Sequence, residues 1–147
     1  MSRDRDAEGR PRNARPRDSL GRPLPRSVGA AAPVDEPALP PMEALARAQQ
    51  LLEDGEAFRA HEVLEAVWKA TSGPERSLWR GLAQLCVGLT HAQRGNRSGA
   101  QALLRRAAET LAEAPPGAGV DPAALAAWAR NAADAPEPAG PPRLVTR

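Results

Sequence analysis

The sequence predicts an all-α fold: a compact bundle of four to five helices built from two helical hairpins, with a disordered or loosely docked N-terminal arm. Two observations predict it. Apolar residues recur every three or four positions through residues 42–133, as they do on one face of a helix. A weak internal repeat also has a spacing of 40 residues, in the pairs Gly55 and Gly95, Ala60 and Ala100, and Leu64 and Leu104. Each copy is typical of a helix, a glycine turn and a second amphipathic helix.

The first hairpin is delimited by proline and glycine. A helix over about residues 42–54 follows Pro41, which suits the start of a helix, and it ends before Gly55. A second helix over about residues 56–71 ends at the breaker Ser72-Gly73-Pro74. These limits predict two helices joined by a glycine turn.

The second hairpin and a short last helix are delimited in the same way. A helix over about residues 74–94 ends before Gly95, where glycine is the preferred C-cap. The next helix begins near residue 97 and ends at Pro115-Pro116-Gly117. A fifth helix covers about residues 121–133, because its first two residues, aspartate and proline, suit an N-cap and a first turn.

The chain divides into a basic arm rich in proline and arginine (residues 1–41, mostly irregular), the bundle domain (42–133) and a disordered tail (134–147). Segments this rich in proline bury too little apolar surface to offset the entropy of ordering them. Residues 1–26 carry eight arginines against four acidic residues, a charge of +4, and since the whole chain is +2 the remainder is −2. Nucleic acid would therefore bind only through the arm, by charge alone.

Composition also limits the cellular setting. The single cysteine, Cys86, excludes an intrachain disulfide and fits a reducing compartment. The N-terminus has charge but lacks the apolar run of a signal peptide. No stretch has the roughly 18 apolar residues that a transmembrane helix needs. We expect a cytoplasmic protein without a membrane partner, from a bacterium whose GC-rich genome explains part of the arginine excess.

The most informative group of polar residues lies on the second helix. His61 and Glu65 stand one turn apart at the edge of its apolar face, so both can point into a groove. An imidazole and a carboxylate at this spacing suit two ligands of one metal ion. The zinc-protease motif has a second histidine where Glu65 stands, which argues against that class of enzyme.

The third helix adds a second polar face. Gly81 and Gly88 share this face with Gln84 and His91, and two glycines on one face let a neighbouring backbone approach closely. If that neighbour is the second helix, the polar residues of both helices meet. The expected cluster then contains His61, Glu62, Glu65, Gln84 and His91, with Trp68 beside it and Asn96 closing one end.

A longer pattern covers residues 55–104. It consists of Gly55, Phe58, Ala60-His61-Glu62-Val63-Leu64-Glu65 and Trp68, then Gly81-Leu82-Ala83-Gln84-Leu85, His91, Arg94-Gly95-Asn96 and Gly99-Ala100. This pattern resembles the family known as domain of unknown function 309, which contains small bacterial and archaeal helical proteins. The resemblance implies an all-helical bundle with a functional His-Glu motif, and it supplies no established activity. Arg59 stands where the family usually has an acidic residue.

Two functions are compatible with these patterns. The first is a polar ligand- or metal-binding site between the second and third helices, in which His61, Glu65 and His91 are candidate ligands of a divalent metal ion and Glu62 is a candidate ligand or general base. The second is a non-enzymatic interaction module, with tetratricopeptide-like hairpins and the basic arm, that binds a protein. In that case the His/Glu cluster is only a structural hydrogen-bond network. The sequence decides neither enzymatic activity nor the identity of the small ligand or protein partner.

Overall fold

The computed structural model describes residues 38–135 and 140–145. Five helices and no strand in these residues confirm the all-α prediction. The helices are α1 (Pro41–Glu53), α2 (Ala57–Ala70), α3 (Arg76–Gln93), α4 (Arg97–Ala112) and α5 (Pro122–Asp134). Most of the predicted basic arm, residues 1–37, lies outside the described residues.

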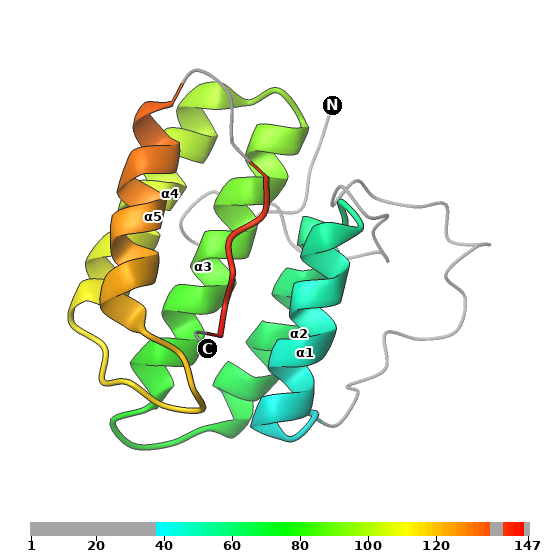
Figure 1. The fold of residues 1–147 in the computed structure, drawn as a ribbon, viewed down its shortest axis with the longest axis vertical. Helices are drawn as coiled ribbons and strands as arrows, with labels where there is room; N and C mark the ends of the chain where they lie inside the picture. The colour runs from blue at the N-terminus through cyan, green and yellow to red at the C-terminus, as the bar shows by residue number, and fades with distance from the viewer. Residues whose placement is uncertain (1–37, 136–139, 146–147) are drawn as a thin grey trace, which may run out of the picture.

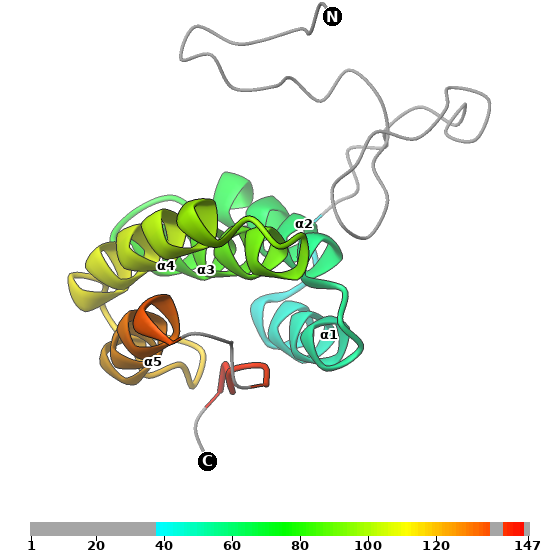
Figure 2. The ribbon, with the colours of Figure 1, turned by 90° about the horizontal axis from the view of Figure 1, so that it is seen from above.

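The helices form two layers. Seen from above, α2, α3 and α4 lie side by side, and α1 and α5 lie on the same face of that layer (Figure 2). Each helix packs on the next along the chain, α1 on α2, α2 on α3, α3 on α4 and α4 on α5. Residues 140–145 cross the gap between α1 and α5, in front of α3 in the view of Figure 1. The bundle is therefore a succession of antiparallel neighbours, and its last segment lies between the two outer helices.

The turns and caps agree with the helix limits expected from the sequence. Gly55 and Gly95 end the first helix of each hairpin, and both have φ near +78°, a conformation that glycine adopts without steric cost. The side chains of Asn96 and Asp121 accept hydrogen bonds from the first turns of α4 and α5, from backbone nitrogens 3.1 and 3.2 Å away. The two matching glycine turns also fit the weak repeat in the sequence.

One hydrophobic core joins the helices. Leu45 of α1, Leu64 of α2 and Leu82 of α3 are at most 1% exposed, and Trp79 is 2% exposed. Cys86 also lies in this core, as expected of a small apolar residue on that face of α3. No helix in the described ranges is long and apolar enough to span a membrane.

The glycine face of α3 packs against α4, whereas the expected polar cluster required it to face α2. A Cβ atom on Gly81 would stand 2.8 Å from the side chain of Leu111. A Cβ atom on Gly88 would stand 2.9 Å from the side chain of Leu104 and 3.2 Å from its backbone nitrogen. The close approach therefore joins α3 to α4, because leucines of α4 occupy the space that the glycines leave.

The prediction of a disordered tail over residues 134–147 is wrong for residues 140–145. Pro142 is buried, and Leu144 is 0% exposed. Gln49 of α1 holds the backbone of this segment through two hydrogen bonds. The order comes from contacts with a helix more than 90 residues earlier in the chain, and local composition carries no sign of it.

Candidate functional site

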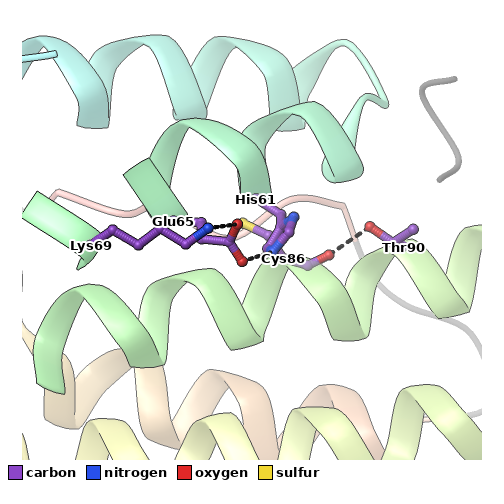
Figure 3. Close-up of polar contacts among 5 residues, drawn as sticks. All are labelled: His61, Glu65, Lys69, Cys86 and Thr90. Carbon is purple, nitrogen blue, oxygen red and sulfur yellow. Dashed lines mark hydrogen bonds and ion pairs between the residues drawn. The ribbon is translucent and has the colours of Figure 1, made fainter. Parts of the chain in front are cut away.

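The polar edge of α2 is a row of three ionisable side chains one turn apart. Nε2 of His61 donates a hydrogen bond to Oε2 of Glu65 over 3.1 Å. On the next turn, Nζ of Lys69 lies 3.3 Å from Oε1 of the same carboxylate. Figure 3 draws this row between the ribbons of α2 and α3. The sequence reasoning found the His61–Glu65 pair but missed Lys69, although its spacing of four residues from Glu65 is the ordinary signal for an ion pair on a helix.

The carboxylate fixes the tautomer of the neutral imidazole. The hydrogen bond from His61 lowers the pKa of Glu65 from 4.5 to about 2, assisted by the charges of His61 and Lys69 and opposed by partial burial. Glu65 is therefore ionised at neutral pH and can only accept hydrogen bonds. Nε2 of His61 must carry the shared hydrogen, so in the neutral ring Nδ1 holds a free lone pair.

Three polar atoms of α2 and α3 are buried without a hydrogen-bond partner in the described part of the chain: Nδ1 of His61 and Nε1 of Trp68 on α2, and Oε1 of Gln84 on α3. Native proteins leave few such atoms unpaired, because each costs about 1–3 kcal/mol in lost solvation. Of the two atoms on α2, Nδ1 of His61 is an acceptor and Nε1 of Trp68 is a donor. This pair suits a ligand that carries both kinds of group.

Two aromatic rings border the row. The ring of Phe58 lies one turn before His61, with its centroid 5.3 Å from that of the imidazole and an interplanar angle of 44°. The indole of Trp68 is half-buried against the core, and the guanidinium of Arg76 stands over it at 5.0 Å. Trp68 is therefore part of the core edge, as its size predicts, and it also faces a cation that the sequence did not indicate.

His91 belongs to a different network at the turn between α3 and α4. Nδ2 of Asn96 donates to Nδ1 of His91 over 2.8 Å, and Oδ1 of Asn96 accepts from the backbone nitrogen of Gly99. Partial burial, with the nearby charge of Arg94, lowers the pKa of His91 and favours the neutral ring that accepts this bond. Asn96 thus caps α4 and anchors His91.

The candidate metal ligands do not converge. Within residues 38–135 and 140–145, no group of three or more His, Cys, Asp or Glu side chains is placed to hold a metal ion. His61 and Glu65 bond to each other, His91 bonds to Asn96, and Glu62 is exposed on α2. The physical reason is the orientation of α3, whose glycine face, with Gln84 and His91 on it, is turned toward α4.

Cys86 has no nucleophilic chemistry in this fold. Burial raises the pKa of its thiol to about 12, so the thiolate is absent at neutral pH. Its backbone carbonyl accepts a hydrogen bond from the hydroxyl of Thr90, which is also buried (Figure 3). Cys86 is therefore a packing residue of the core.

Residues 45–103, which contain the His61–Glu65 row and the turn at Asn96, match a family model described as Domain of unknown function (DUF309). This part of the chain is similar to the members of that family. The family expected from the sequence pattern is confirmed. No curated protein and no solved structure matches the chain. The matched residues include all of α2 and α3 and parts of α1 and α4, and α5 lies beyond them.

Proposed function

We propose that the bundle binds a small polar ligand at the edge between α2 and α3, with Nδ1 of His61 as its hydrogen-bond acceptor. One observation carries the proposal. The Nδ1 lone pair is buried without a partner among the described residues, while Glu65 holds the ring by its other nitrogen. The carboxylate orients the imidazole and leaves Nδ1 as its acceptor, which is the arrangement found behind ligand-binding and catalytic histidines.

The unpaired atoms indicate the chemistry of this ligand. Nδ1 of His61 requires a donor, and Nε1 of Trp68 on the same helix requires an acceptor. A primary or secondary amide carries both an N–H donor and a carbonyl acceptor. Toward a more acidic N–H or O–H group, the same lone pair would serve as a general base. We therefore favour an amide-like molecule over a divalent metal ion, for which this edge supplies only His61 and Glu65.

Nitrogen-15 NMR of the two histidine rings in tag-free protein tests the proposal, because His61 and His91 are the chain's two histidines. Acetamide is the organic probe and zinc chloride the metal probe. The expected result is a saturable shift of the His61 Nδ1 resonance with acetamide, no shift of His91, and loss of the effect in Glu65→Gln. A His61 response to zinc alone, or to neither probe, would overturn the proposal. We propose a cytoplasmic location, and Cys86 is a free cysteine. The NMR experiment is therefore done in reducing buffer throughout.

A second candidate function, a non-enzymatic interaction module, is favoured by the order of packing. Each helix of the bundle packs on its neighbour in sequence, as in stacked helical-hairpin repeats. That arrangement produces extended surfaces between the outer helices, where protein partners bind. This function predicts that partner capture survives His61→Ala, whereas ligand binding at His61 does not.

A further inference from the structure

The groove between α1 and α5 already holds a peptide segment without helix or strand, which is the chain's own residues 140–145. In both views this segment lies between the two outer helices (Figures 1 and 2). Pro142 and Leu144 are buried and Arg143 between them is exposed. Alternation of this kind is what an extended strand produces when one side faces a receptor. The segment therefore sits in the groove as a bound peptide would.

Gln49 of α1 binds the backbone of the segment through both the nitrogen and the oxygen of its side-chain amide. Its Nε2 donates to the carbonyl of Pro142 over 2.9 Å, and its Oε1 accepts from the backbone nitrogen of Leu144 over 2.8 Å. These bonds involve only main-chain atoms of the segment, so they fix its direction and register for any side chain at position 143. Main-chain hydrogen bonds combined with pockets for alternate side chains are the usual way in which proteins recognise extended peptides.

The helices leave this groove open to an occupant. Among the described helices, α1 packs closely on α2, and α5 packs closely on α4. Leu144 belongs to the same buried core cluster as residues of both outer helices. The core between α1 and α5 is therefore completed by the segment, and any other chain that supplied a proline and a leucine in this register would complete it equally.

The groove extends beyond what the segment fills. A pocket of about 290 Å³ adjoins Gly140 and Pro141, and its other walls include Leu52, Ala57 and Leu89 from α1, α2 and α3. Gly140 has no side chain to place there, and Pro141 is small and exposed. A peptide with a large apolar residue at the position of Pro141 would bury additional surface in this pocket. The chain's own segment is thus an incomplete ligand for the site.

We propose that the groove between α1 and α5 is a peptide-binding site, which residues 140–145 occupy in cis. Its partner in trans is an extended segment of another protein with the pattern large apolar–Pro–Xaa–Leu, in the register of residues 141–144. Because a tethered segment competes at an effective concentration of order millimolar, it weakens the binding of any outside peptide. The site is separate from His61, so it stands whether or not a ligand binds there.

Fluorescence anisotropy with two labelled peptides tests the proposal. One peptide has the chain's own sequence, Gly-Pro-Pro-Arg-Leu-Val, and the other has tryptophan in place of its first proline. The full-length chain is compared with Leu144→Ser, which releases the segment, and with Arg143→Ser, the matched control at the exposed position between. We expect Leu144→Ser to bind both peptides at least tenfold more tightly than the control, and to prefer the tryptophan peptide at least threefold. Adding Gln49→Ala to Leu144→Ser should abolish binding.

If Leu144→Ser does not fold, the unaltered chain supplies the same test. In a ¹H–¹⁵N NMR titration with millimolar tryptophan peptide, the amide of Leu144 and the side-chain amide of Gln49 should both shift as the segment is displaced. Failure of both peptides to bind folded Leu144→Ser, or absence of these shifts in the unaltered chain, would overturn the proposal. Concentration-dependent dimerisation without peptide binding would also overturn it, since the groove would then serve a second copy of the chain.

Discussion

The hydrogen bond between His61 and Glu65 makes the stability of the bundle depend on acid. A pKa lowered from 4.5 to about 2 corresponds to roughly 3 kcal/mol in full. Because the side chain of Glu65 is 30% exposed, screening by solvent reduces this to about 1–2 kcal/mol. A lowered carboxyl pKa stabilises the folded state above the ordinary pKa, and that stability is lost as pH falls from about 4.5 to about 2. We therefore expect Glu65→Gln to lower the free energy of unfolding by about 1–2 kcal/mol at pH 7.

Urea unfolding followed by circular dichroism, at several pH values from 7 to 2, measures this effect. The difference between the original chain and Glu65→Gln should shrink progressively below pH 5 and disappear near pH 2. Glu109→Gln, at an exposed position of α4, is the control and should change stability by less than about 0.5 kcal/mol. Equal stability of Glu65→Gln and the original chain at pH 7, or a difference that does not change with pH, would refute the reasoning.

Two further predictions concern packing. Gly88→Ala should lower stability by up to about 2 kcal/mol, because overpacking against the backbone nitrogen of Leu104 outweighs the better helix propensity of alanine. Gly81→Ala should lower stability less, since the atoms nearest to its new Cβ belong to the side chains of Leu111 and Thr110. Chemical denaturation of both variants measures this difference. A Gly88→Ala variant more stable than the original chain would contradict this packing. Iodoacetamide should leave Cys86 unmodified in the folded protein and label it on unfolding, as mass spectrometry would detect, whereas rapid native labelling would show that the thiol is accessible.

Most of the fold could be predicted because the signals that determine it are local. Apolar residues at helical spacing and the glycines at positions 55 and 95 specify each helix and its end within a few neighbouring residues. The packed segment at residues 140–145 could not be predicted in this way. Pro142 and Leu144 are too few to suggest a core, and their burial depends on Gln49, which is distant in sequence.

The contact between His61 and Glu65 could be predicted because it is local, whereas the partner of His91 could not. His61 and Glu65 share a helix, so their spacing alone brings them together. His91 lies on α3, beside the face that carries the two glycines. Helical periodicity shows that glycines share this face, but it does not show which neighbouring helix packs on it. Here α4 covers the glycine face, so His91 joins Asn96 rather than the row on α2.

The late position of residues 140–145 in the chain has a consequence during protein synthesis. All five helices precede this segment, and α1 with Gln49 precedes it by about 90 residues. Because α5 ends only a few residues before the segment, the two become available almost together, whereas the α1 wall with Gln49 is made much earlier. A partner made at the same place and time would meet the α1 wall before the chain's own segment does.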